Sequence, residues 1–567
     1  MKTPTKRPYF EVFLLLLVLI PHVVIATHNA NTVLDWYTTD DAFYYFQVAR
    51  NIAAGNGVTF DGLTHTNGFH PLWMAVCVPV FALAQVNVLL SLRVLVVVLG
   101  LLNAAAGIVL YHLGKRYFTP AVAALLALFW ALTPAIHTMI TKGGVEAGLN
   151  AFFILLLWER LSAFNDDSFP EKGGLRQIFW LGVIATLTIL SRLDNVFIVF
   201  FGGAWLWLHW WQPQTDKAAD ARDKWLWRFK TGTAFFAPVV VVMLAYMAWN
   251  QIAFGTPMPV SGQIKVWWGT LEKTVYGFPI KHFETFWGQF FTADEDLGPW
   301  STLTAPLYAA AENVLPILGM KATIATRRVA LLGIGGGLAL VAGVLVWYNR
   351  RFVVETAKHL GLVPFFLACF AQICYYKLGH SMAQQPWYWI MQLVFMAFVL
   401  GILLESFYRL VACIRASDEL GQHIAQVVFM LACVVLAFNF LDYMRRSTRP
   451  DTDPSAHFYL DRPAWVEANT GPGARIAITG AGNLGYFTED RTIINLDGLM
   501  NSTAYFEHLK AGTGAQYLAE LGVDYIFGNP YMMEETNPYA PMLAGKIEEY
   551  KRYHFGEREL VLWKFTP

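Results

Sequence analysis

The chain has 567 residues, of which 56% are hydrophobic and only 14% are charged, and its mean hydropathy is +0.41. So few charges could not cover the surface of a soluble protein of this size, and the composition therefore indicates a polytopic membrane protein. The formal net charge is zero, which excludes a strongly basic chain and predicts no nucleic-acid partner.

Eleven segments are apolar over roughly the 20 residues that a helix needs to cross a bilayer. The basic residues of the short connecting loops fall on one side of the membrane if the N-terminus is cytoplasmic. An odd number of spans then places the C-terminus outside, in a multi-pass protein of the cell (inner) membrane. The predicted spans lie near residues 9–27, 91–113, 120–138, 147–163, 177–191, 194–211, 231–250, 331–348, 361–377, 387–406 and 422–441.

Two further apolar segments, residues 71–88 and 301–328, do not fit this count. Counting 71–88 as a span would move the basic loop at Lys115 to the outside, so we expect this segment to lie along the outer interface. Whether 301–328 crosses the membrane stays open at this point, because Arg327 argues against placing its end outside.

The first outer loop, residues 28–90, carries two adjacent acids, Asp40 and Asp41. In the stretch DDAFYYFQVARNIAAGNG, apolar residues recur at helical spacing up to Gly55, which predicts an amphipathic helix on the membrane surface. The helix dipole favours negative charge in the first turn, so one interpretation is that Asp40 only caps this helix. One cap needs only one acid, however, and carboxylates kept at a membrane boundary usually have a function.

Later outer loops add further charges and aromatic rings. TKGGVEAGLN contributes Lys142 and Glu146, and SRLDN contributes Arg192 and Asp194, which also fit a buried structural ion pair. A long loop that begins AFGTPMPVSGQIKVWW adds Lys265, and KLGHSMAQQPWYW adds aromatic residues. Aromatic faces suit a sugar, cations suit a phosphate, and a carboxylate can serve as a base for an acceptor hydroxyl.

Residues 443–567 are polar enough to form an α/β domain outside the membrane. RIAIT, TIINL, DYIFG and ELVLWKF have the composition of strands, and helices are expected near 463–469 and 502–521. GAGNLG and the later Asp497 fit a dinucleotide-binding fingerprint. The following YFTEDRT interrupts any long helix and NAD is scarce outside the cell, so we expect the glycines to shape a tight strand-to-helix turn. Acceptor binding or docking is the expected role of the domain.

Six motifs occur in the order DDAFYYFQVARNIAAGNG, NGFHPLW, KGGVEAGLNAF, LSRLDNVF, FGTPMPVSGQIK and GNLGYFTEDRTIINLDGLMN. Together they resemble the GT-C superfamily of integral-membrane glycosyltransferases, in particular the bacterial group near the arabinofuranosyltransferases and protein O-mannosyltransferases. The resemblance implies a polytopic α-helical GT-C domain in residues 1–442, with about 11 transmembrane helices, and a small extracytoplasmic α/β domain in residues 443–567. It also implies transfer of a hexosyl or pentosyl group from a polyprenyl-phosphate donor to a glycan, lipid or protein acceptor on the outer face.

The resemblance assigns roles to individual residues. Asp40 corresponds to the catalytic acid and would be the base, with Asp41 as the second member of the pair and Glu146 as a second acid. His70, before a Pro-Leu pair, lies where relatives carry a phosphate-binding basic residue, although the Lys and one Pro of the common pattern are missing. Whether a divalent metal assists stays open, and no other cofactor is implied. The residues expected to bind the donor phosphate and sugar are His70, Lys142, Arg192 and Lys265.

Two other classes of protein remain as alternatives. A transporter or flippase for a lipid or sugar would carry ionisable residues at mid-membrane depth and repeated halves. Here the charges lie mostly at the outer boundary, and the sequence contains no internal repeat. A non-catalytic receptor for a lipid-linked sugar is the second alternative, and the activity of an Asp40 variant would distinguish it from an enzyme.

Overall fold

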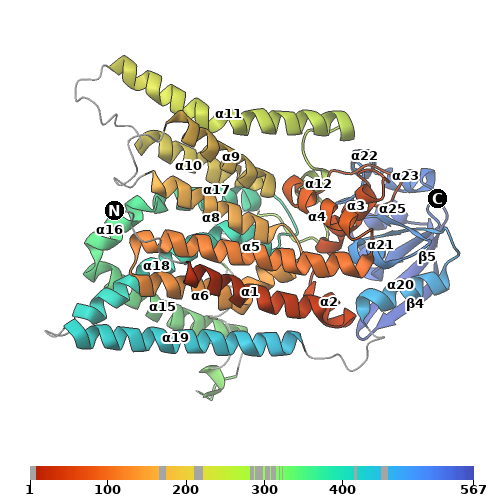
Figure 1. Cartoon of the computed structure of the whole chain (residues 1–567). Helices are drawn as coiled ribbons and strands as arrows, with labels where there is room; N and C mark the ends of the chain where they lie inside the picture. The colour runs from red at the N-terminus through yellow and green to blue at the C-terminus, as the bar shows by residue number, and fades with distance from the viewer. Residues whose placement is uncertain are drawn as a thin grey trace.

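Apolar helices form an elongated bundle, and a small α/β domain lies at one end of it (Figure 1). Parts of the 212–230 linker, of the loop after Ile280 and of the ambiguous segment 301–328 lie outside the described residues. The computed structural model describes residues 8–164, 174–209, 221–280, 323–413, 418–448 and 457–567, together with short stretches between 286 and 321.

Each of the eleven segments predicted to span the membrane forms a helix. These helices are α1 (Tyr9–Thr27), α5 (Val88–Tyr117), α6 (Pro120–Leu132), α8 (Ala147–Ala163), α9 (Leu175–Ser191), α10 (Val196–His209), α11 (Ala221–Phe254), α15 (Ile324–Tyr348), α17 (Leu362–Leu378), α18 (Ile390–Cys413) and α19 (Asp418–Ser447).

The length and composition of these helices identify a membrane bundle. Among the described residues, six helices can cross a bilayer by length and composition, or up to eight spans if each of two bent helix pairs is one span. α9 and α10 are apolar but shorter. Large apolar side chains are exposed along α11, α15 and α19, as expected where lipid is the solvent. The total of eleven spans stays a prediction.

Bends interrupt regular helix at two places, one within a predicted span and one at the start of another. After α6, the chain bends by 56° into α7 (Pro134–His137) and a π-helical turn, Thr138–Lys142. Pro134 has no amide hydrogen to donate to the preceding turn, which accounts for the break. α16 (Arg350–His359) meets α17 at 65°, and Gly361 between them has a left-handed φ of 62°.

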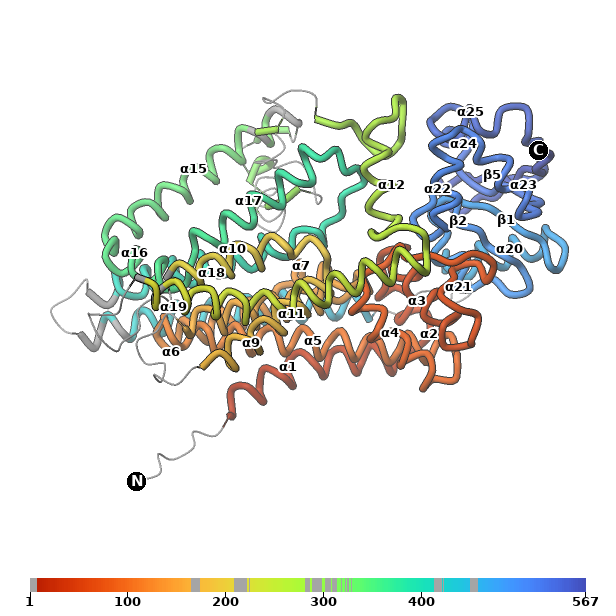
Figure 2. The backbone as a smooth tube through the Cα atoms, turned by 90° about the horizontal axis from the view of Figure 1, so that it is seen from above, coloured from red at the N-terminus to blue at the C-terminus, as the bar shows by residue number. Residues whose placement is uncertain are grey.

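The two ends of the bundle carry different elements. α16, with Arg350, Arg351 and Lys358, lies at the end away from the C-terminal domain in both views (Figures 1 and 2). The cytoplasmic location of this end stays a prediction from these basic residues. The elements next to the C-terminal domain are α2 (Ala30–Trp36), α3 (Asp41–Ala53), α4 (Pro71–Leu83) and α12 (Val260–Trp268).

The helix predicted in the first outer loop is confirmed as α3, but it does not lie on the membrane surface. Phe43 is fully buried and packs against Tyr459, Tyr486 and Phe487 of the C-terminal domain, with ring centroids 5.0 to 5.5 Å apart. The other side of α3 packs on α4. The apolar face that suggested an interfacial helix is therefore buried between the bundle and the domain.

The C-terminal domain contains a five-stranded sheet in the order β2-β1-β3-β5-β4. The four predicted strands are confirmed; β1, β2 and β3 are parallel, and β5 pairs antiparallel to β3 and β4. β4 was missed because its sequence, IEEYKRYHF, is largely polar and exposed along the sheet edge. The strands are β1 (Arg475–Ile478), β2 (Thr492–Asn495), β3 (Tyr525–Gly528), β4 (Ile547–Phe555) and β5 (Arg558–Phe565).

Helices cover both faces of the sheet, and one face shares its core with the bundle. Ile476, Ile478 and Phe527 belong to the same buried cluster as the bundle residues, whereas Ala477 and Ile494 belong to a second cluster on the other face. The domain is therefore packed firmly on the membrane part. Its helices are α20 (Phe458–Asn469), α21 (Gly482–Phe487), α22 (Thr503–Lys510), α23 (Gly514–Glu520), α24 (Pro530–Glu535) and α25 (Tyr539–Leu543).

Candidate active site

A cavity of about 720 Å³ lies where the end of the bundle that carries α3 and α4 meets the C-terminal domain. Its polar wall comes from α3, the start of α4, the turn between α9 and α10, α12 and the segment before α18. The C-terminal domain contributes Leu499, Met500, Phe506 and Lys510. The cavity is thus completed only when the domain is in place.

One side of this cavity is apolar and reaches the membrane face of the bundle. Val196 and Phe197 of α10 and Tyr375 of α17 line it. Val196 is 48% exposed and Tyr375 is 49% exposed, so both also lie on the outer surface of the helices. A ligand with an apolar tail could therefore occupy the cavity and still contact lipid.

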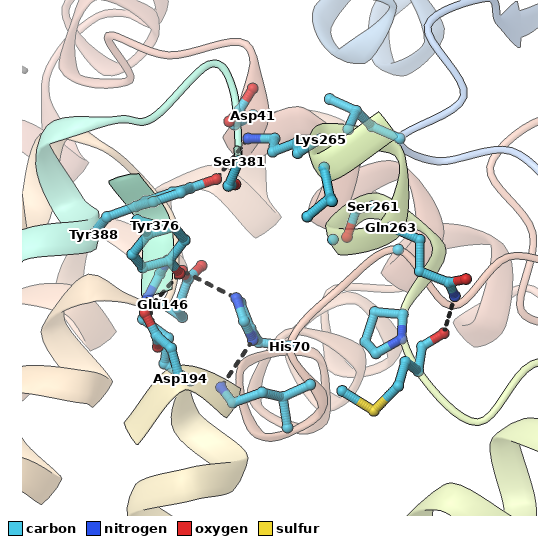
Figure 3. Close-up of a pocket in the computed structure, with 18 of the residues that line it drawn as sticks. Asp41, His70, Glu146, Asp194, Ser261, Gln263, Lys265, Tyr376, Ser381 and Tyr388 are labelled. Carbon is cyan, nitrogen blue, oxygen red and sulfur yellow. Dashed lines mark hydrogen bonds and ion pairs between the residues drawn. The ribbon is translucent and has the colours of Figure 1, made fainter. Parts of the chain in front are cut away.

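Asp41 presents its carboxylate to the cavity. Figure 3 shows Asp41 at the same end of the cavity as Lys265 and Tyr388. The Lys265 ammonium donates to the Tyr388 hydroxyl at 2.5 Å and to the Ala383 carbonyl at 3.3 Å. Within the described part of the chain, no group donates a hydrogen bond to the Asp41 carboxylate, which leaves it free to bind a ligand.

The charges around Asp41 set its proton affinity. Burial raises the pKa of Asp41, Lys265 lowers it, and Asp497 and Glu146 raise it further. Burial opposes the charge of Lys265, but Tyr388 and Asp41 together raise the pKa of Lys265 above its usual value. A carboxylate with a raised pKa is a stronger base than one in water, as long as it remains ionised.

Glu146 and Arg192 form a second buried network, which adjoins Lys265 through Tyr388. The Arg192 guanidinium donates to Glu146 at 2.5 Å and to Asp194 at 3.1 Å, and all three residues are more than nine-tenths buried. Tyr45 donates to the second Glu146 oxygen at 2.9 Å, and Tyr376 donates to Asp194 at 2.6 Å. The alternative of a structural ion pair in SRLDN is confirmed, and Glu146 is its second anion.

His70 joins this network from the start of α4. Its Nε2 lies 3.6 Å from Glu146, and its Nδ1 accepts from the Leu193 amide at 3.5 Å (Figure 3). Burial lowers the pKa of His70, although Glu146 opposes this shift. The imidazole is therefore neutral near pH 7 and suited to hydrogen bonding rather than to charge neutralisation.

Asp40, one residue before Asp41, faces the C-terminal domain instead of the cavity. Its carboxylate accepts from the amides of Gly482 at 2.9 Å and Asn483 at 2.7 Å. Burial raises the pKa of Asp40 to about 6, against the opposing effects of Arg462 and these two amides. Asp40 does not line the cavity.

The glycines of GAGNLG allow this contact. A Cβ on Gly482 would lie 2.2 Å from the Asp40 carbonyl oxygen, and Gly480 has a left-handed φ of 60°. The tight strand-to-helix turn predicted here is confirmed, because α21 follows β1 after only three residues. Asp497, the acid of the apparent fingerprint, accepts from the Gly480 amide at 3.0 Å and from the Tyr44 hydroxyl at 3.1 Å.

The structure thus gathers five of the seven predicted residues around one cavity and separates two from it. Lys142 lies over the rings of Trp36 and Tyr443, at 5.1 and 5.2 Å, and Asp40 lies in the domain contact. The five that line the cavity are Asp41, His70, Glu146, Arg192 and Lys265.

Several residues of the cavity were not predicted from the sequence. Tyr376 and Tyr388 supply hydroxyls to its charged groups, but only the aromatic composition of KLGHSMAQQPWYW pointed to that segment. Tyr44 also lines the cavity and accepts from the Ala481 amide at 3.0 Å. Its helical position beside Asp40 and Asp41 was the available signal.

The described residues contain no preformed metal site. No group of three or more His, Cys, Asp and Glu side chains in the described residues is arranged to hold one. Asp41 has the Lys265 ammonium beside it, and Glu146 is bonded to Arg192.

Solved structures share the fold of this chain, but their sequence identity to it is low. No curated protein matches the sequence. A family model described as a domain of unknown function, DUF8728, matches residues 456–560.

Solved structures resemble nearly the whole chain. The oligosaccharyltransferase of Archaeoglobus fulgidus, in complex with Zn and sulfate, matches with a TM-score of 0.54 and 13% identity, over 98% of this chain and 73% of that one. The same organism's oligosaccharyltransferase AglB, in complex with an inhibitory peptide and a dolichol-phosphate, has a TM-score of 0.51 and 12% identity over 97% and 74%. A mycobacterial arabinofuranosyltransferase, AftD, has a TM-score of 0.39 and 14% identity over 100% and 42%. The helical bundle and the C-terminal sheet domain of this chain therefore share the overall fold of the archaeal oligosaccharyltransferase structures.

Proposed function

We propose that the chain is a membrane glycosyltransferase that moves a sugar from a polyprenyl-phosphate donor to an acceptor hydroxyl on the outer face of the membrane. The observation that carries the proposal is the Asp41 carboxylate, which faces a large cavity next to Lys265. The apolar wall at Val196 and Tyr375 supports a lipid-linked donor, because it connects the cavity to the membrane. AglB was solved with dolichol-phosphate, a lipid of the same chemical class.

Asp41 is the proposed base, in place of its neighbour. Asp40 is held by two amides of the C-terminal domain, whereas Asp41 faces the space that a substrate would fill. In the reaction, Asp41 takes the proton of the acceptor hydroxyl while its oxygen forms a bond to the anomeric carbon. The bond from that carbon to the phosphate oxygen breaks, and polyprenyl phosphate leaves as an anion.

Lys265 is the proposed cation for the leaving phosphate. It is 8% exposed and its hydrogen bonds go to the neutral oxygens of Tyr388 and Ala383, so its charge remains for a ligand. A fixed charge in a water-poor site stabilises developing negative charge strongly. Arg192 is bonded to two acids and serves to position Glu146 and His70.

The test is a transfer assay with purified protein and a panel of polyprenyl-phosphate sugars, in which released polyprenyl phosphate is measured. We expect Asp41→Asn to lower turnover by about 10²–10⁴-fold, because an amide cannot take a proton. Donor binding, measured in parallel, should persist. Asp40→Asn is the matched control and should retain more activity than Asp41→Asn. If Asp41→Asn keeps full turnover and only Asp40→Asn loses it, Asp40 and not Asp41 is the base.

A further inference from the structure

The turn formed by residues 380–383 lies against Lys265 at one end of the large cavity. The Met382 amide donates to the Lys265 carbonyl at 2.9 Å, and the Lys265 ammonium donates to the Ala383 carbonyl at 3.3 Å. His380 and Ala383 have left-handed φ values of 58° and 52°, which residues other than glycine rarely adopt. Such strained residues are concentrated at active and ligand-binding sites, which makes this turn a candidate for ligand binding.

Three hydrogen-bond donors at this turn have no acceptor within the described part of the chain. An ammonium has three N–H groups, and Lys265 uses two of them, for the Tyr388 and Ala383 oxygens. The Tyr388 oxygen accepts from Lys265, so its own O–H is left to donate. The Ser381 hydroxyl also has no partner, and unlike the enclosed unpaired side-chain atoms it keeps accessible surface. Figure 3 shows Ser381, Lys265 and the hydroxyl of Tyr388 at the same end of the cavity.

The charge at this end of the cavity favours an anion. Arg192 is bonded to two acids and Lys510 is paired with Glu507, whereas Lys265 donates only to neutral oxygens. The charges of Asp41 and Lys265 act on each other, but no hydrogen bond or ion pair joins the two side chains. Three free donors, one of them charged, suit an anion with several oxygens better than a single neutral hydroxyl.

We propose that Ser381, Tyr388 and Lys265 bind the phosphate of the lipid-linked substrate, each donating to one of its oxygens. The inference rests on the proposed function, which supplies the identity of that substrate. The phosphate of a polyprenyl-phosphate sugar is a diester with two terminal oxygens. When the bond to the anomeric carbon breaks, its electron pair stays on a third oxygen, which becomes terminal and negatively charged. Three donors therefore match the leaving phosphate better than the bound donor, and this difference favours the cleavage.

Binding is tested by calorimetric titration of the full-length protein in detergent with farnesyl phosphate, a short polyprenyl phosphate, and with farnesol, which lacks the phosphate. No sugar donor is present, so turnover does not interfere. We expect Ser381→Ala and Tyr388→Phe each to weaken farnesyl phosphate binding by about tenfold, the ratio for one hydrogen bond to a charged group, and to leave farnesol binding unchanged. Ser261→Ala is the matched control and should keep the wild-type affinity. Ser261 lines the same cavity but lies next to Gln263 and not at the turn (Figure 3).

Two results would overturn the site: farnesyl phosphate binds no more tightly than farnesol, or both Ser381→Ala and Tyr388→Phe bind it with wild-type affinity. Inorganic phosphate distinguishes the source of the anion. The apolar wall of the cavity predicts that it binds more weakly than farnesyl phosphate, and equal affinity would refute a lipid-linked ligand. Failure of the proposed function gives a different pattern, in which farnesyl phosphate binds as expected but no polyprenyl-phosphate sugar is consumed.

Discussion

The carboxylate of Asp40 accepts hydrogen bonds from the backbone amides of Gly482 and Asn483, more than 440 positions further along the chain. These amides begin α21, immediately after the first strand of the C-terminal sheet. Phosphates commonly bind at such a turn in dinucleotide-binding folds, because amide hydrogens and the helix dipole favour an anion there. Here a side chain of the first outer loop supplies the anion, and the glycine-rich turn is a docking site for that loop.

Gly482→Ala should therefore loosen the domain from the bundle. The new Cβ would meet the Asp40 carbonyl oxygen at 2.2 Å, so the backbone must shift and the two hydrogen bonds of Asp40 weaken. We expect a lower Tm in detergent, by several degrees, and reduced transfer. Gly471→Ala, in the same domain with open space around it, is the control and should keep the wild-type Tm. Equal melting of the two variants would contradict the docking role.

The stability of the protein should depend on pH through Asp40. Its pKa in the folded chain is about 6, raised by burial from an ordinary value of 3.8, so the folded state binds this proton more tightly than the unfolded state. The stabilisation is fully present below about pH 4 and is lost as the pH rises through about 6. Wild-type Tm should fall more over this range than the Tm of Asp40→Asn. Parallel curves for the two proteins would refute the assignment.

The acidic limb of the rate profile should move when Lys265 is removed. If Asp41 is the base, as proposed, transfer requires its ionised form, and kcat/KM falls as the pH drops through the pKa of that carboxyl. Lys265 lowers this pKa, and Lys265→Met should shift the limb to higher pH as well as weaken donor binding. Lys510→Met removes a cation from the cavity rim that does not act on Asp41, and its limb should stay in place. If the acidic limb of the Lys265→Met profile lies at the wild-type pH, Lys265 does not affect the pKa of Asp41.

Arg192 should be more important for stability than Glu146. Arg192→Met leaves Glu146 and Asp194 buried without their cation, a change that typically costs about 3–5 kcal/mol. Glu146→Gln keeps a hydrogen-bond partner for Tyr45 and leaves Arg192 paired with Asp194, so its loss of stability should be much smaller. Thermal unfolding in detergent measures both. A wild-type Tm for Arg192→Met would show that the network is not structural.

The orientation of the bundle predicts which ends are accessible from outside. A cysteine at position 471 in the C-terminal domain should react with an impermeant thiol reagent in intact cells, whereas one at 112, near the basic end of α5, should not. The native cysteines Cys77 and Cys369 are buried and should stay unlabelled. Labelling at 112 and not at 471 would invert the topology.

The sequence was sufficient for elements whose residues follow a simple periodicity. All eleven apolar segments are helices, and α3 ends before Gly55 as its pattern predicts. The count of spans does not follow from apolar length alone, since Pro134 bends one segment by 56°. β4 was missed because an exposed edge strand has no apolar alternation to detect.

The sequence predicts that charged loops converge on one site, but it does not predict the role of each residue in that site. The charged outer loops do converge on one cavity, yet Asp40 and Asp41 are adjacent acids that sequence cannot tell apart. Their roles depend on a partner in the C-terminal domain, and the contact between Asp40 and Asn483 has no local signal.

Asp40 and Asp41 are adjacent at the start of α3. Asp40 binds the C-terminal domain, and Asp41 faces the cavity. This arrangement restricts how related chains can be recombined. A chimera that takes its C-terminal domain from another chain would present a foreign α21 to Asp40, and a misfit there would also disturb the adjacent Asp41. Exchange of the domain will therefore yield active hybrids only when the first outer loop is transferred with it.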